Sequence, residues 1–135
     1  MSIATEPSAY AKRWLNKYAP DVVMFERCSL VELRHILDAL ALANEAMAGV
    51  YNRPAFDIDG PGGAWLEKAI RRLEGQRQAL VEHVKLRTPR TDEDYIAYCH
   101  ILLEWEARHE SRPKFVKQLA EQLMTMGPVG RKVAS

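Results

Sequence analysis

Apolar side chains recur every three or four positions along most of this chain, which is the spacing of amphipathic helices. No segment shows the alternation that is typical of strands. The pattern predicts a short first helix and four longer ones, over residues 7–19, 29–51, 64–87, 91–109 and 113–126. We therefore expect an all-α fold, a bundle of four principal helices plus a short N-terminal helix. It forms a single domain over residues 1–135, with tails at 1–6 and 128–135.

Local signals place the helix ends and connections. Ser29 and Glu32 have the spacing of a capping box, so the second helix begins there. Residues 21–28 contain the run VVMF and are interpreted as an apolar connector, since Pro20 cannot continue the first helix. Gly75 lies inside a predicted helix, which indicates close backbone approach or a bend. The long loop over 50–63 allows its flanking helices to be parallel or antiparallel.

The segment YIAYCHILLEW, residues 95–105, is apolar over more than half of its helical circumference. Such a helix must be covered on several sides. It is therefore predicted to be the central helix of the bundle, or to lie between the bundle and a second subunit. The second possibility predicts a homodimer. The residues expected at an interface with a partner are Tyr98, Ile101, Trp105, Val31, Leu42 and Trp65.

Aromatic side chains mark the first helix, where Tyr10, Trp14 and Tyr18 recur every four residues. They form a ridge on one face, which is interpreted as core packing.

Charge and composition narrow the range of partners. Lys and Arg number 19 and Asp and Glu number 18, so no strong field favours a polyanion. Nucleic acid is therefore not expected as a partner, although the basic start of the last helix, with Arg112, Lys114 and Lys117, offers a DNA-binding alternative. The N-terminus lacks the features of a signal peptide and no apolar run is long enough to span a membrane. These observations predict a cytoplasmic protein without membrane contact.

The sequence contains only weak signatures of metal sites and of catalytic residues. Glu32–His35 and Glu106–His109 both have the Glu-x-x-His spacing of di-iron bundles. Glu32 already serves the capping box, and a fourth carboxylate has no obvious source, so no metal is expected. No Ser or Cys lies in a triad-like context and no Gly-rich phosphate loop occurs. The sequence therefore predicts no cofactor and no catalytic residue.

Polar residues on otherwise apolar stripes are the remaining candidates for a binding site. They are Asn44, Arg77, Glu106 and His109. Helix geometry places Arg77 within reach of Glu106, so we expect these two residues to pair at or inside the core. The pair either fixes helix register and subunit choice or lines a pocket for a small anion or metabolite.

The expected function follows from the absence of catalytic signatures. The sequence favours a small protein that acts by protein–protein association, as a regulator, adaptor or accessory factor. The first alternative is a metabolite-, anion- or metal-binding bundle that uses Arg77 and Glu106. The second is a DNA-binding regulator that uses the last helix.

Overall fold

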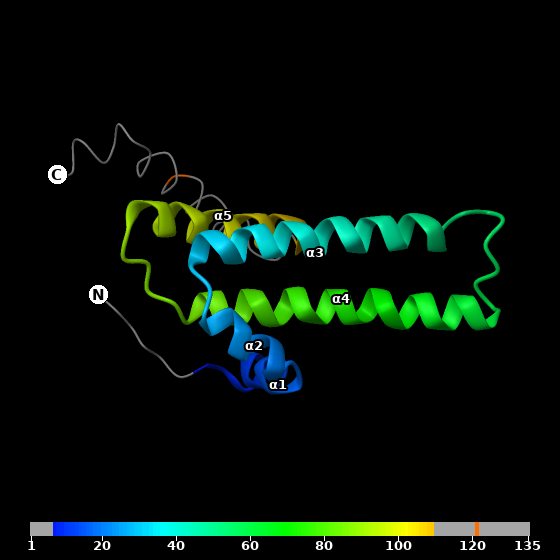
Figure 1. The fold of residues 1–135 in the computed structure, drawn as a ribbon, viewed down its shortest axis with the longest axis horizontal. Helices are drawn as coiled ribbons and strands as arrows, with labels where there is room; N and C mark the ends of the chain where they lie inside the picture. Colours follow the sequence, from blue (N-terminus) through cyan, green and yellow to red (C-terminus); the bar gives the residue numbers. More distant parts are fainter. Residues whose placement is uncertain (1–6, 110–120, 122–135) are drawn as a thin grey trace.

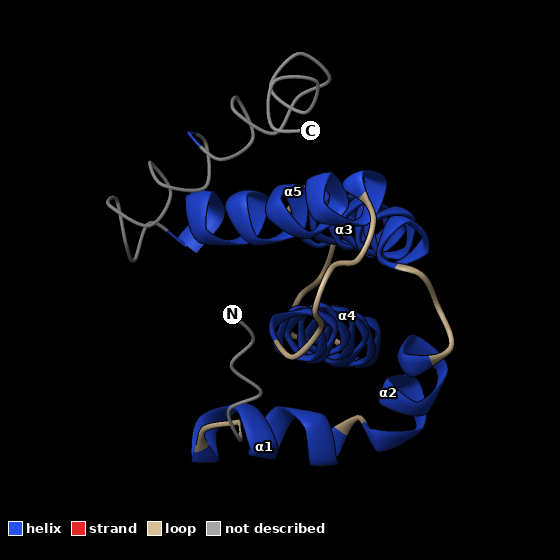
Figure 2. Cartoon of the chain, turned by 90° about the vertical axis from the view of Figure 1, so that its left-hand side faces the viewer, coloured by secondary structure: helices blue, strands red, loops and turns tan. Residues whose placement is uncertain are grey.

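Helix α4 (Pro61–Lys85) runs through the middle of the molecule and contacts each of the other described helices. The computed structural model describes residues 7–109 and residue 121, and within these it contains five helices and no strand. The other four helices are α1 (Ala9–Lys17), α2 (Ala19–Glu26), α3 (Leu30–Tyr51) and α5 (Asp92–His109). Seen along α4, Figure 2 shows α3 and α5 on one side, α1 on the opposite side and α2 between them. The predicted all-α bundle is confirmed.

The N-terminal region folds as two helices where the sequence predicted one. Ser8 caps α1, because its hydroxyl oxygen accepts a hydrogen bond from the Ala11 N–H at 3.1 Å. The chain turns at Tyr18, and Pro20 then lies in the first turn of α2, where a helix does not use the missing N–H. The interpretation of residues 21–28 as a connector is therefore wrong. The predicted last helix, over 113–126, lies outside the described residues.

Helices α3 and α4 form an antiparallel hairpin (Figure 1). Of the two topologies that the long loop allowed, the antiparallel one is therefore present. The predicted capping box opens α3: the Glu32 N–H donates to Ser29 Oγ and the Ser29 N–H donates to Glu32 Oε1, both at 3.1 Å. The chain turns back over residues 52–60, and α4 begins at Pro61, three residues before the expected start. Counted from this turn, residue 44 lies level with about residue 68, and residue 36 with about residue 76.

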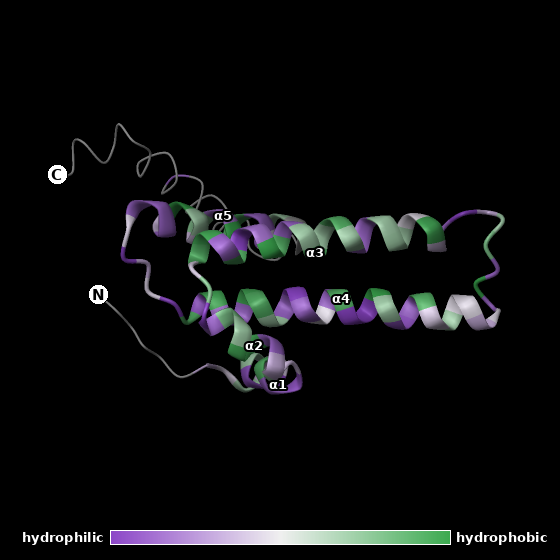
Figure 3. Ribbon diagram, in the orientation of Figure 1, coloured by the Kyte–Doolittle hydropathy of each residue, from purple (hydrophilic) through white to green (hydrophobic). Residues whose placement is uncertain are grey.

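The core lies where the second half of α4 meets α2, α5 and the first half of α3. Its buried members are Phe25, Leu30, Leu33, Leu37, Ala79, Leu80, Val81, Val84, Ala97, Cys99, Ile101, Leu102 and Trp105. Helix α5 contributes the last five and packs against α3 and α4. The central position predicted for residues 95–105 belongs to α4 instead. Hydropathy does not reveal the central position of α4, because the middle of this helix carries many hydrophilic residues (Figure 3).

Arg87, two residues after the end of α4, connects this helix to the end of α2 by hydrogen bonds. Its Nη2 donates hydrogen bonds to the backbone oxygens of Phe25 and Cys28, both at 2.7 Å. Its Nε donates to Nε2 of His83 at 3.1 Å. A cation at the C-terminal end of a helix is favourable because the carbonyl groups there point outward without partners. His83 must stay neutral to accept this bond, so proton binding by His83 opposes this connection.

Stability is therefore expected to fall as the pH drops through the histidine range. Burial and, after it, the charge of Arg87 lower the pKa of His83 from its ordinary value of 6.5, while Glu26 acts in the opposite direction. The unfolded chain then binds a proton at a higher pH than the folded chain does. The free energy of unfolding therefore decreases as the pH falls below about 6.5, and the decrease ends once the pH is below the pKa of His83 in the folded state.

Urea unfolding followed between about pH 7 and pH 5 measures this effect. The decrease should be smaller in His83→Gln, and some of it should remain, because burial also lowers the pKa of His100. His35→Gln is the matched control, since His35 is exposed on α3. If the free energy of unfolding of His83→Gln decreases between about pH 7 and pH 5 by as much as that of the unaltered chain, protonation of His83 is not coupled to folding.

Candidate functional site

Two adjoining hollows follow one side of α4. The first, of about 430 Å³, is lined by Ala64, Trp65, Glu67, Lys68 and Arg71. The second, of about 350 Å³, is lined by Trp14, Lys17, Tyr18, Arg71, Glu74, Gly75, Gln78 and Trp105. Arg71 lines both, so the two hollows adjoin, and we call them together the α4 trough. From Ala64 to Gln78 it follows α4 for about 21 Å at 1.5 Å per residue.

Helical spacing explains why the trough has this position. Most of its α4 residues recur at intervals of three and four, from Ala64 through Arg71 to Gln78, and therefore share one face, with Trp65 beside the edge of that face. The opposite face carries Leu66 and Leu80, which are buried. At the second hollow, α1 and α5 flank the trough from two sides, because both helices cross α4 (Figure 2).

Gly75 forms the floor where α1 meets α4. A Cβ atom built at Gly75 would lie 2.7 Å from Cε2 of Tyr18 and still closer to its Cζ and hydroxyl oxygen. Only a residue without a side chain allows the tyrosine ring to approach the α4 backbone this closely. Of the two interpretations of Gly75, the structure therefore supports close approach, which brings the end of α1 to the trough.

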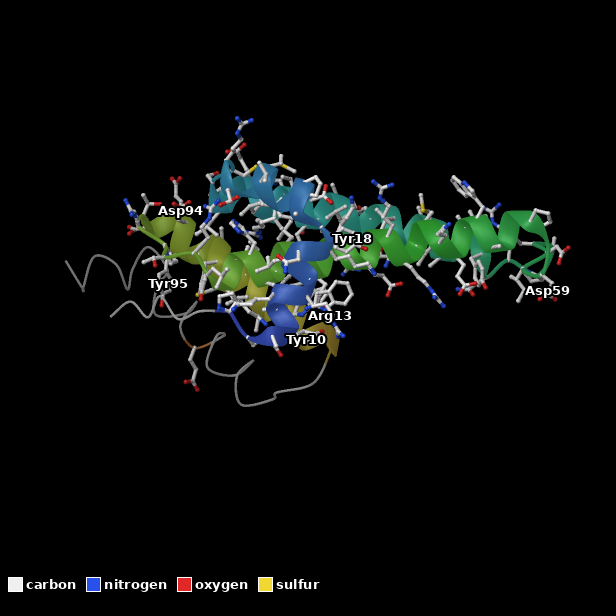
Figure 4. All side chains as sticks on the ribbon, turned by 90° about the horizontal axis from the view of Figure 1, so that it is seen from below. Tyr10, Arg13, Tyr18, Asp59, Asp94 and Tyr95 are labelled. Atoms are coloured by element: carbon white, nitrogen blue, oxygen red, sulfur yellow. The ribbon has the colours of Figure 1, made fainter. Side chains whose placement is uncertain are left out.

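The α1 wall of the trough is aromatic and basic. Trp14 stacks on Tyr18 at 6.2 Å between ring centroids with planes 14° apart, and meets Tyr10 edge-on at 6.4 Å. The Lys17 ammonium lies 5.7 Å from the Trp14 centroid, and the Arg13 guanidinium lies 6.0 Å from that of Tyr10 (Figure 4). Tyr10 is exposed and Trp14 and Tyr18 are half-buried. Trp14 and Tyr18 of this ridge line the second hollow, so core packing describes the ridge only in part.

Trp105 forms the α5 wall and connects the trough to the buried arginine. The Arg77 guanidinium carbon lies 5.8 Å from the Trp105 ring centroid. The cation therefore lies over the aromatic face, and this arrangement is electrostatically favourable. Arg77 and Glu106 are both buried, as their positions on the apolar stripes predicted. The Arg77–Glu106 pair itself stays a prediction.

The four predicted ligand-binding residues do not come together at one place. Asn44 is half-buried on α3. The hairpin register places it level with about residue 68, which is about 13 Å along α4 from Arg77. The side chain of His109 lies outside the described residues. Only Arg77 and Glu106 are shown to be buried near the second hollow.

The predicted interface residues differ widely in exposure. Ile101 is fully buried and offers no surface to a partner, whereas Trp105 is 9% exposed and lines the second hollow. Val31 and Tyr98 are half-buried against the core. Leu42 and Trp65 are 67% and 68% exposed. Of these two, Trp65 lines the first hollow, while Leu42 lies on α3.

The trough has the chemistry of a binding surface. The described residues that line it combine aromatic rings, an amide and charged groups, and none of them is Ser, Cys or His. Among residues 7–107, no three His, Cys, Asp or Glu side chains are grouped to hold a metal ion. Within the same part of the chain, each helix is too short or too polar to cross a membrane.

The fold and the trough define a class: an all-α protein whose helices surround a central helix and leave a depression along one side of it. Comparisons with protein-family models, curated proteins and solved structures found no match. The function is therefore argued from the site itself. Sequence reasoning missed the trough, although the aromatic spacing in residues 10–18 and the glycine at position 75 were signals for it.

Proposed function

We propose that this protein acts by protein–protein association, as a small regulator or adaptor, and that the α4 trough binds an amphipathic helix of its partner. One observation carries the proposal: all three tryptophans of the chain line the two adjoining hollows, Trp65 the first and Trp14 and Trp105 the second. Tryptophan is enriched among the residues that contribute most to binding at protein interfaces.

The dimensions of the trough suit a helix. A length of about 21 Å corresponds to about four helical turns. Helices that bind in grooves place apolar anchors at positions such as i, i+3 or i+4, and i+7 along one face. One set of anchors would contact Trp65 at the first hollow. A second set would enter between Trp14 and Trp105, where α1 and α5 flank the second hollow.

The proposal also includes the homodimer and the cytoplasmic location expected from the sequence. Native mass spectrometry of the full chain reports the subunit number directly.

Selection of peptides from a displayed library of random 15-residue sequences tests the trough as a binding surface. We expect the selected peptides to have helical apolar spacing, and Trp65→Ala to weaken their binding by roughly tenfold or more. Trp65 is well exposed, so its replacement leaves the core intact. Leu42→Ala is the control with a matched exposure, and it should leave binding unchanged. Peptides that bind Trp65→Ala as tightly as the unaltered chain would contradict the proposal.

A further inference from the structure

We infer that the partner helix is acidic at the end that enters between α1 and α5. This inference rests on the proposed function, because it describes the helix that the α4 trough would bind. It is carried by the distribution of charge around the second hollow.

The α1 wall presents positive charge only. Among residues 9–17, three are basic and none is acidic. Arg13 and Lys17 are exposed and lie one turn apart on the side of α1 that carries the aromatic ridge. Lys17 lines the second hollow and lies against the rings of Trp14 and Tyr18. Arg13 lies one turn away, against the ring of Tyr10. Figure 4 shows Arg13 beside Tyr10 on α1, and Tyr18 where α1 meets α4.

The α4 floor does not offset this charge. Arg71 and Glu67 pair with each other at 2.7 Å, one turn apart on the helix. Lys68 lines the first hollow and Glu74 lines the second. The charged residues that line the second hollow are Lys17, Arg71 and Glu74, so two of the three are basic. Positive charge therefore predominates near the second hollow, and Lys17 on α1 contributes to it.

A partner helix fits this surface when its apolar side chains contact the rings and its carboxylates lie toward Arg13 and Lys17. Such pairs would lie at the edge of the interface, where charges contribute mainly to partner choice and to the rate of association. The energy of binding comes from the rings, and the preference for an acidic partner comes from α1. The two contributions can therefore be tested separately.

Two synthetic 15-residue amphipathic helices provide the test. Both have the same apolar stripe, and the polar positions of one terminal turn carry Glu in one peptide and Lys in the other. We expect the Glu peptide to bind the full chain roughly tenfold more tightly at low salt. This difference should shrink as salt is added, because exposed charges are screened. Fluorescence anisotropy of labelled peptides measures both affinities.

Charge reversal on α1 supplies the matched variants. In Arg13→Glu/Lys17→Glu the preference should invert, while Arg90→Glu, on the loop between α4 and α5, should leave it unchanged. Circular dichroism checks that each variant is folded. Equal binding of the two peptides, with both weakened by Trp65→Ala, would overturn the acidic partner and leave the trough as the binding surface. Tighter binding of the Lys peptide than of the Glu peptide would likewise overturn the acidic partner. If neither peptide binds, the proposed function fails, and this inference fails with it.

Discussion

Replacing Leu80 by alanine should lower the free energy of unfolding by about 2–5 kcal/mol. Leu80 is fully buried near the middle of the core, on the helix that contacts all the other described helices. Removing its isobutyl group forfeits the free energy of burying those atoms and leaves a cavity that rigid neighbours fill only in part. Because small domains are stable by only about 5–15 kcal/mol, this variant should be close to unfolding under ordinary conditions.

Urea titration of the Leu80→Ala chain, followed by far-UV circular dichroism, measures the loss. Leu42→Ala is the control, since it makes the same chemical change on α3 at a position that is 67% exposed. We expect this control to change the free energy of unfolding by no more than about 0.5 kcal/mol. Similar losses in the two variants would contradict the position of α4 at the centre of the core.

Replacing Gly75 by alanine should destabilise the protein by about 1–3 kcal/mol, although the same change stabilises most helices. In an exposed helix interior, alanine is favoured over glycine by about 1 kcal/mol. Here the new Cβ would overlap the ring of Tyr18, so the ring and the end of α1 would have to move. The cost of overpacking then exceeds the gain in helix propensity. Displacement of α1 would also open the second hollow, so peptide binding to the trough should weaken.

Two comparisons separate overpacking from other causes. Gly49→Ala on α3 is the matched control, because nothing lies within 4 Å of a Cβ at that position, and it should stabilise the chain by about 1 kcal/mol. In the Tyr18→Ala background the ring is gone, so adding Gly75→Ala should become stabilising. If Gly75→Ala remains destabilising without the Tyr18 ring, the contact between them is not the reason for this glycine.

Local chemistry made much of the fold predictable. The capping box at Ser29 and Glu32 depends on residues three positions apart, and the structure contains both of its hydrogen bonds. Gly75 was equally informative, because a glycine inside a helix carries a cost that a close contact explains. Helix α2 was missed because its eight residues show no clear periodicity and begin with Ala19-Pro20, which was interpreted as a stop. Proline in a first turn is compatible with either interpretation.

The central position of α4 could not be predicted from hydropathy, because its buried part includes charged residues. Glu82 is buried and accepts a hydrogen bond from the Gln78 amide at 2.8 Å and one from the Lys85 ammonium at 3.4 Å. His83 is buried beside Arg87. Such groups are tolerated inside a protein when partners replace water, and those partners are visible only in three dimensions.

The trough could be predicted only in part, for a related reason. Its lining comes from three helices, and nothing in the sequence indicates that Trp14, Trp65 and Trp105 line adjoining hollows. The sequence analysis predicted Trp65 and Trp105 as interface residues and Arg77 as a ligand-binding residue. The structure places Arg77 against Trp105, and so it connects candidates that sequence reasoning had kept separate.

Nuclear magnetic resonance of the three indole N–H groups tests the α4 trough most directly. Each tryptophan gives one indole signal, and all three line the proposed binding surface. When the ¹⁵N-labelled full chain is titrated with the Glu peptide, we predict that the indole signals of Trp14, Trp65 and Trp105 shift together along one binding curve, while the backbone amide signal of Leu42 stays in place. Binding that leaves the indole signals unmoved, or that shifts the Leu42 amide signal instead, would contradict the account.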